Sequence, residues 1–154
     1  MSLLHNFVRE SNRIEGIMRA PQDHEINAVH EFTGVRLLTI QSFEELVTAI
    51  QPGAKLRFKE GMDVRVGNWV PPSGGSEVVT ALSRLISDLP ELTPHEAHCR
   101  YLTLHPFMDG NGRSARALWL RMVMATCEYD TLSRVGFLHT FYYQTLAAHD
   151  ERAK

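Results

Sequence analysis

The chain has 154 residues, of which 44% are apolar, with 16 basic side chains against 18 acidic ones. A chain of this length builds one domain with a core of ordinary size and is short for two. A formal charge of −2 and a pI near 6.4 provide no general attraction to nucleic acid or to an anionic membrane, because such binding is usually driven by a basic patch. We therefore predict one domain with neither nucleic acid nor membrane as a partner.

The sequence also indicates a compartment. No stretch approaches the roughly 20 apolar residues of a membrane span, and the first residues lack a continuous apolar signal region. Cys99 and Cys127 lie in apolar segments without the spacings of a disulfide framework, which favours free thiols in a reducing environment. We predict a cytoplasmic protein.

The first third of the chain has helical patterns. Apolar residues at helical spacing predict a first helix that contains or ends close to the sequence SNRIEG, residues 11–16; they are Leu3, Leu4, Phe7, Val8, Ile14 and Met18. A second helix is expected to start at residues 21–23, with Ile26 and Val29 on its buried side, and Gly34 leaves its end open. Ser42 followed by Glu45 is a capping-box pattern and predicts a third helix that stops at residues 51–53.

Residues 55–70 change pattern. The sequences KLRF and DVRV alternate polar and apolar side chains on either side of KEGM, and PPSGG follows. Alternation around a turn that contains glycine is typical of a β-hairpin. This is the one convincing pair of strands in the sequence.

The remainder is again helical. Apolar residues at 78–86 have helical spacing, and Thr93, Pro94 and Glu96 supply the cap, first-turn proline and capping-box partner of a helix that runs to residue 104. The sequence ALWLRMVMA is apolar nearly all round, which predicts a buried central helix, and a last helix is expected over residues 137–149. The predicted fold class is mainly α, a compact helical bundle with one hairpin.

The sequence HPFMDGNGRSAR, residues 105–116, joins two of these helices. A helix N-terminus presents unpaired N–H groups and partial positive charge, and Gly110 and Gly112 let an anion approach the backbone. Arg113 and Arg116 are three residues apart, so they share a helix face and suit more than one phosphate group. The segment favours binding of a polyphosphate.

Two further residues of this segment indicate chemistry. Asp109 would repel phosphate unless a cation lay between them, and Mg²⁺ typically binds through one carboxylate, phosphate oxygens and water. His105 can accept a proton near neutral pH and so activate a hydroxyl nucleophile. Each residue alone more often has a structural role in a turn or a surface ion pair, but together they indicate nucleotidyl or phosphoryl transfer.

The segment resembles the motif of the Fic family, H-x-F-x-[D/E]-G-N-G-R-x-x-R, at every fixed position: His105, Phe107, Asp109, Gly110, Asn111, Gly112, Arg113 and Arg116. The family has a compact helical fold with a β-hairpin flap ahead of the motif, where residues 55–70 lie. Tyr142 and Tyr143 near the end are also similar to family sequences. The resemblance implies a single Fic domain over residues 1–154.

The resemblance implies transfer of AMP from ATP to a Ser, Thr or Tyr hydroxyl of a target protein. It makes His105 the general base and Asp109 the Mg²⁺ ligand. Asn111 and the backbone at Gly110 and Gly112 would cradle the α- and β-phosphates, Arg113 would contact the phosphates, and Arg116 would bind the γ-phosphate. The two glycines favour AMP transfer, since similar Doc toxins that phosphorylate carry lysine at the second position, and phosphocholine transferases carry alanine at the first.

Residues 11–16 acquire a meaning from the same resemblance. Ser11, Glu15 and Gly16 match the inhibitory motif [S/T]-x-x-x-E-[G/N] of many Fic proteins, which makes residues 1–20 an inhibitory segment. The implied mechanism is that Glu15 pairs with Arg116 and leaves ATP in an unproductive pose. Without the resemblance, the same pattern is a helix with an exposed glutamate and a C-terminal glycine.

The hairpin gives a docking prediction. An exposed strand edge holds an extended peptide by main-chain hydrogen bonds, so we expect the flap, with Arg57, Val64 and Arg65, to bind the target segment.

Alternatives remain open. One is removal of AMP from a modified protein, with the inhibitory glutamate orienting water; another is a non-catalytic module that binds nucleotide or a partner. A homo-oligomer is possible. His95, His98 and Cys99 are close enough on one helix to suggest zinc, but no second pair of ligands is obvious.

Overall fold

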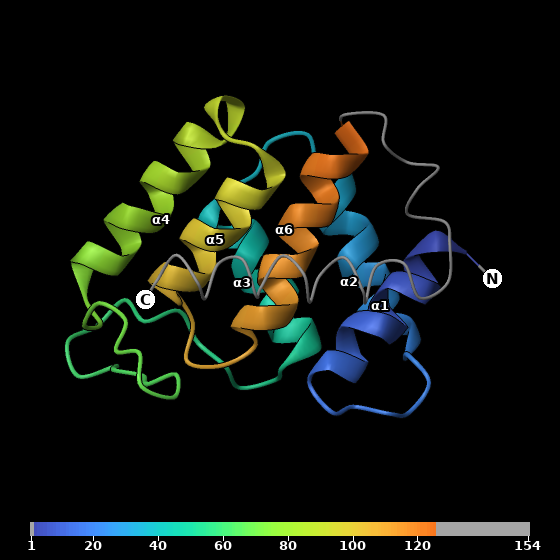
Figure 1. Ribbon diagram of the computed structural model, residues 1–154, viewed down its shortest axis with the longest axis horizontal. Coiled ribbons are helices and arrows are strands. Elements are labelled where there is room, and N and C mark those ends of the chain that lie inside the picture. Colours follow the sequence, from blue (N-terminus) through green and yellow to red (C-terminus); the bar gives the residue numbers. More distant parts are fainter. Residues whose placement is uncertain (1, 126–154) are drawn as a thin grey trace.

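A computed structural model describes residues 2–125 and is mainly α-helical, as the sequence predicts (Figure 1). The helices of this part are α1 (Leu3–Ile14), α2 (Asp23–Gly34), α3 (Ile40–Ile50), α4 (Ser76–Asp88), a short 3-10 helix η1 (Leu89–Glu91), α5 (Pro94–Leu104) and α6 (Asn111–Ala125). None of these helices is long and apolar enough to cross a membrane. The predicted last helix, Tyr142, Tyr143 and Cys127 lie outside the described residues.

Helix α6 is the centre of the bundle. It contacts α5, α2, α3 and α1, and Figure 1 shows it between α5 on one side and α1 and α2 on the other. Nearly every residue from Asn111 to Leu120 is buried, which confirms the buried central helix. Because the motif of residues 105–116 runs into this helix, the core itself fixes the orientation of the motif's second half.

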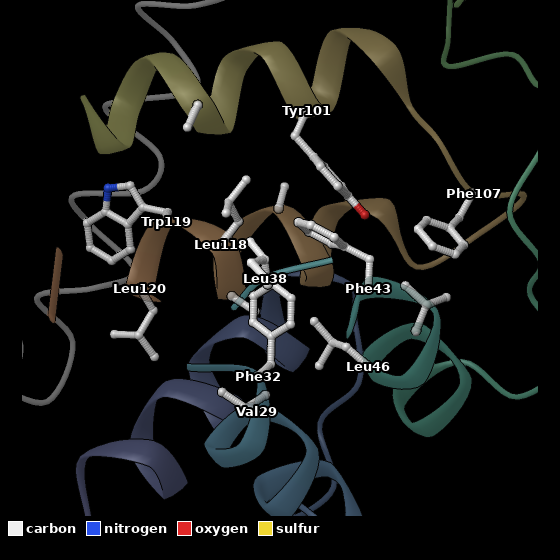
Figure 2. Packing of buried hydrophobic residues seen from close by; sticks show 14 of the residues in the cluster. Val29, Phe32, Leu38, Phe43, Leu46, Tyr101, Phe107, Leu118, Trp119 and Leu120 are labelled. Atoms are coloured by element: carbon white, nitrogen blue, oxygen red, sulfur yellow. The ribbon is translucent and has the colours of Figure 1, made fainter. Parts of the chain in front are cut away.

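Aromatic side chains bring the motif into the core (Figure 2). Phe43 contacts Phe32 edge-on, with ring centroids 5.0 Å apart, and stacks on Tyr101 at 5.2 Å. The Tyr101 hydroxyl lies 2.8 Å from Ser114 Oγ on α6, and burial raises the pKa of Tyr101 far above its usual range. Phe107 is 1% exposed, so it anchors the loop between α5 and α6 by burial.

The helix starts show where local signals succeed. The Thr93 hydroxyl accepts from Glu96 N–H, and the Glu96 carboxylate accepts from Thr93 N–H, as the capping box predicts. The predicted start of the third helix is wrong by about one turn, because Thr39 rather than Ser42 is the cap and Ser42 is its partner.

The first helix is shorter than its pattern suggests. It ends at Ile14, Glu15 is its C-cap, and Gly16 has a φ of 78°, a left-handed conformation that favours glycine. Met18, expected to continue the apolar face, is 70% exposed in the loop beyond.

The predicted hairpin over residues 55–70 is wrong. Within residues 2–125 the structure has no sheet, and the only bridges are two isolated ones, Leu56 with Phe107 and Val66 with Trp69. The backbone of the first expected strand bonds to the motif instead of the second strand: Arg57 N–H donates to Pro106 O at 2.9 Å, and Met108 N–H donates to Lys55 O at 2.9 Å. In the first expected strand, Lys55 O and Arg57 N–H are therefore already paired with the motif loop.

The side chains of this loop also explain why it forms no hairpin. Arg57 was expected on a docking surface, but it is fully buried and its guanidinium donates to Met62 O and Pro72 O, which folds residues 58–72 around it. Val64 is half-buried and Arg65 is exposed, with Nε donating to Gly67 O at 2.9 Å. Side-chain bonds to backbone groups have replaced cross-strand pairing.

Candidate active site

His105 stands at the junction of α5 and the motif loop. It is the C-cap of α5, its N–H donates to Tyr101 O at 2.9 Å, and its φ of 50° is the only positive φ outside glycine in residues 2–125. A left-handed conformation is unfavourable for a residue with a Cβ, so the surroundings must impose it.

The charge state of His105 suits a base. Burial lowers the pKa of His105, and the positive charge of Arg57 lowers it further, against the opposing effects of a hydrogen bond from the imidazole to the backbone of Leu102 and the charge of Asp109. The imidazole is therefore neutral at neutral pH, the state that accepts a proton.

The loop after His105 is tied by Asn111. This side chain is 2% exposed; its Oδ1 accepts from Phe107 N–H at 2.9 Å and its Nδ2 donates to Phe107 O at 2.8 Å. The resemblance implies that Asn111 contacts phosphate, whereas here its amide closes the loop that shapes the site.

A side chain is disfavoured at Gly110 and at Gly112 for different reasons. Gly110 has a φ of 76°, and a Cβ there would lie 3.3 Å from Gln51 Cβ. A Cβ on Gly112 would collide with Glu15 Oε1. Gly112 belongs to the first turn of α6, so the Glu15 carboxylate lies at the helix N-terminus where the sequence predicts an anion.

Asp109 is exposed beside this N-terminus, and its Oδ1 accepts from Gly110 N–H at 2.7 Å. An exposed carboxylate next to a phosphate-binding backbone fits Mg²⁺, a hard cation that often takes one protein carboxylate and completes its shell with phosphate oxygens and water. Among the described residues there is no group of three or more His, Cys, Asp and Glu that could hold a metal.

Arg113 points to the end of α3. It is 8% exposed, its Nη1 donates to Ile50 O at 2.8 Å, and its Nη2 donates to Gln51 Oε1. Burial lowers the pKa of Arg113, and the charge of Glu15 opposes that effect. The sequence analysis did not single out Gln51, because no local pattern reveals a contact across 62 residues of chain.

Arg116 joins the motif to the N-terminal segment. Its Nε donates to Ser11 Oγ at 2.7 Å, and its Nη2 donates to Ser11 O at 3.1 Å and to Glu15 Oε1 at 2.6 Å. The guanidinium is 3% exposed and the Glu15 side chain 40%. The structure thus brings Arg116 into contact with Ser11 and Glu15, which precede it by about 100 residues in the chain.

Comparison with known proteins agrees with this geometry. Residues 74–123 match the model of the Fic/DOC family, a range that contains α4, α5 and the whole motif 105–116. This match supports a Fic domain in this part of the chain. No curated protein matches the chain.

Proposed function

We propose that this protein is an autoinhibited protein adenylyltransferase, which transfers AMP from Mg²⁺-ATP to a hydroxyl side chain of a target protein. The observation that carries the proposal is the contact of Arg116, the last residue of a complete Fic motif, with Ser11 and Glu15. A phosphate-binding motif and an anion that competes for its arginine meet at one helix N-terminus.

In the forward reaction, neutral His105 removes the proton from the target hydroxyl as its oxygen attacks the α-phosphorus of ATP. A new O–P bond forms, the bond between the α-phosphorus and the bridging oxygen breaks, and pyrophosphate leaves. The lowered pKa of His105 keeps the imidazole ready to accept this proton at neutral pH. The base is thus available without a preceding deprotonation.

The phosphates would bind at the N-terminus of α6, on the N–H groups around Gly110 and Gly112. When bound to Asp109, Mg²⁺ would neutralise charge on the phosphate oxygens. The absence of a side chain at Gly112 keeps this backbone accessible and distinguishes the chain from the phosphorylating Doc pattern with lysine there.

Inhibition follows from the position of Glu15. Its carboxylate lies against Gly112 and on Arg116, so a γ-phosphate that needs the same arginine meets a like charge and an occupied donor. Displacement of the end of α1 would remove both obstacles at once. Wild type should therefore be nearly inactive even with saturating ATP.

The test is incubation with α-labelled ATP, Mg²⁺ and cell lysate. Glu15→Gly should label one or more bands, wild type almost none, and Glu15→Gly with His105→Ala none. Glu91→Gly is the matched control, because it also removes an exposed glutamate from a helix end, and it should behave as wild type. If Glu15→Gly labels no band, and itself remains unlabelled, the proposal fails.

The reverse reaction is a second candidate. Because the Glu15 side chain is 40% exposed at the mouth of the phosphate site, it could orient a water molecule for removal of AMP from a modified target. Wild type would then release AMP from a protein labelled by Glu15→Gly, and Glu15→Gly would not. A non-catalytic module would neither add nor remove AMP.

A further inference from the structure

Arg57 is a permanent cation that is 0% exposed, and its hydrogen bonds go to backbone carbonyls. Nε donates to His105 O at 2.7 Å, Nη2 to Leu104 O at 2.9 Å, and Nη1 to Pro72 O at 2.7 Å and Met62 O at 3.2 Å. A buried charge is costly unless every donor is used, so this set of acceptors holds the guanidinium in one place. The Arg57 side chain thereby connects the end of α5 with two separate parts of the loop of residues 58–72.

Two of these acceptors decide how α5 ends. The last carbonyls of a helix lack intrahelical partners, and Leu104 O and His105 O find theirs on Arg57. These carbonyls belong to the peptide planes on either side of the His105 Cα, and His105 has a left-handed φ of 50°. Hydrogen bonds on both sides of a strained residue fix the peptide planes that maintain it.

The backbone of the same segment adds to this connection. Arg57 N–H donates to Pro106 O at 2.9 Å, and Arg57 O accepts from Gly75 N–H at 3.0 Å. Residues on both sides of His105 are thus held by Arg57, which is 48 positions away in the chain.

We propose that Arg57 is a positioning residue, which holds His105 in its catalytic orientation and couples the loop of residues 55–75 to it. This inference rests on the proposed transfer reaction. Arg57 does not touch the reacting atoms; it acts through the carbonyls of Leu104 and His105. The loop on which we expect the target and the base that activates the target hydroxyl therefore move as one unit.

The experiment uses the full chain in the Glu15→Gly background, with Arg57→Gln and Arg57→Lys. Arg121→Gln is the matched control, because Arg121 is also a partly buried guanidinium whose Nη1 donates to backbone carbonyls, Phe32 O at 2.9 Å and Thr33 O at 3.3 Å. It lies on α6 about 15 Å along the helix from Asn111, the first residue of α6, given a rise of about 1.5 Å per residue. Loss of a guanidinium that donates to backbone carbonyls is common to both variants, and of the two only Arg57 contacts the loop that contains His105.

For Arg57→Gln we expect kcat to fall about 100-fold, the effect of roughly 1 Å of misplacement of a catalytic group, while KM for ATP and the Kd of Mg²⁺-ATP change by less than about threefold. Arg57→Lys should recover part of kcat, since an ammonium reaches some of the same carbonyls. Arg121→Gln should lower Tm yet leave kcat within about threefold of the parent, because its contacts are remote from the chemistry.

A second readout needs no activity. Hydrogen exchange of the amides of residues 104–108, which include the bonds of His105 N–H to Tyr101 O and Met108 N–H to Lys55 O, should be at least about tenfold faster in Arg57→Gln and unchanged in Arg121→Gln. If Glu15→Gly transfers no AMP, the proposed function has failed, and this measurement still decides the positioning role.

Gly74→Ala keeps the inference testable if Arg57→Gln does not fold. A Cβ on Gly74 would collide with Met62 O, an Arg57 acceptor, and lie 2.8 Å from Lys59 O, so it disturbs the loop without touching His105. It should lower kcat and accelerate exchange at residues 104–108 with ATP affinity retained. Unchanged kcat and exchange in Gly74→Ala, or in a folded Arg57→Gln, would overturn the proposal, as would a parallel loss of kcat and ATP affinity.

Discussion

At the scale of single residues, Arg57 acts on both the backbone and the charge of His105. Its guanidinium donates to the carbonyls of Leu104 and His105, and its positive charge adds to burial, the larger effect, in lowering the pKa of the imidazole. A sequence pattern reveals neither effect, because the alternating residues of 55–58 gave Arg57 the appearance of a surface residue of a strand. His105, by contrast, stands out in the sequence as the candidate base because its motif is contiguous, and its catalytic role stays a prediction.

The lowered pKa of His105 predicts the acid limb of the activity profile. A base must be neutral, so kcat/KM of Glu15→Gly should be constant near neutral pH and fall only as the pH drops through the lowered pKa of His105, below the reference of about 6.5. The charges that act on it are Arg57, which lowers the pKa, and Asp109, which raises it. A midpoint above pH 7 in a kcat/KM profile would contradict this assignment.

Removal of the imidazole should separate chemistry from binding. In the Glu15→Gly background, His105→Ala should lose about 10² to 10⁴-fold in transfer, the usual contribution of a general base, and keep its affinity for Mg²⁺-ATP. Rate measurements with labelled ATP and calorimetry on the same protein provide the two values. Normal transfer by this variant would exclude His105 as the base.

At the scale of elements, the end of α1 is held by a second set of contacts, which the sequence analysis missed. Glu25 of α2 is 1% exposed and accepts from Arg19 Nη1 and Nη2 at 2.9 and 3.0 Å, from Gln22 N–H at 2.7 Å and from Asn12 Nδ2 at 3.4 Å. Burial alone would raise the pKa of Glu25, but the bonds from Arg19 and Gln22 hold it below its usual value. This latch of Asn12, Arg19, Gln22 and Glu25 fixes the loop that follows Glu15.

Weakening the latch should raise activity without altering the nucleotide site. Arg19→Ala removes a bidentate partner, so the end of α1 leaves α2 more often and a larger fraction of molecules frees Arg116. We expect a rise in AMP transfer of about fivefold, modest because the Arg19 side chain is 45% exposed and its ion pair is screened by water.

Arg36→Ala, which removes an exposed arginine from the loop after α2, is the matched control and should leave transfer unchanged. In the Glu15→Gly background Arg19→Ala should have no further effect, because the inhibitory carboxylate is already absent. Equal activation in both backgrounds would show that the latch acts by another route.

Docking of a target segment at Val64 and Arg65 stays a prediction, although the hairpin from which we derived it is absent from residues 2–125. Within the described residues the backbone of Val64 and Arg65 has no backbone hydrogen bond, so an extended target segment can still pair there. Proline at position 64 or 65 should lower target modification at least about tenfold and leave ATP affinity within about twofold, because proline removes a main-chain donor. Unchanged transfer to the target in both variants would exclude this edge.

The elements also show which sequence signals were sufficient. The start of α5 depends on three neighbouring residues, Thr93, Pro94 and Glu96, and was predicted correctly. Formation of the hairpin depends on which segment pairs with residues 55–57, and in the structure that segment is the motif loop about 50 residues later. Alternation of polar and apolar residues indicates that a segment can form a strand, but it does not identify the segment with which that strand pairs.

At the scale of the whole molecule, the bundle places the proposed inhibitory segment and the Fic motif on adjacent helices. The end of α1 meets the first turns of α6 through Ser11, Glu15 and Arg116, and α2 braces α1 through Glu25. The bundle of α2, α3, α5 and α6 can stay packed while α1 moves, since α1 contributes few of the buried core residues. Relief of the proposed inhibition would therefore need displacement of α1 and no rearrangement of the core.

The sequence predicted this meeting only through a resemblance. Local patterns in residues 11–16 are those of an ordinary helix end, and about 100 residues separate Glu15 from its arginine. Packing of a mainly helical chain brings such residues together, and no periodicity encodes which pair will meet. The motif 105–116 was recognisable because its chemistry is contiguous, whereas Arg113 contacts Gln51 and Arg57 contacts His105 only in the folded protein.

The most direct test of inhibition by Glu15 is the initial rate of labelled-AMP incorporation by purified wild type, Glu15→Gly, and Glu15→Gly with Arg116→Ala, at identical Mg²⁺ and ATP. A competent fraction of about 1%, equivalent to about 2.7 kcal/mol, predicts that Glu15→Gly is on the order of 100-fold faster than wild type with little change in ATP affinity, and that the double variant loses most of the gain. A Glu15→Gly rate within about threefold of wild type would contradict the account and reduce residues 11–16 to the end of a helix.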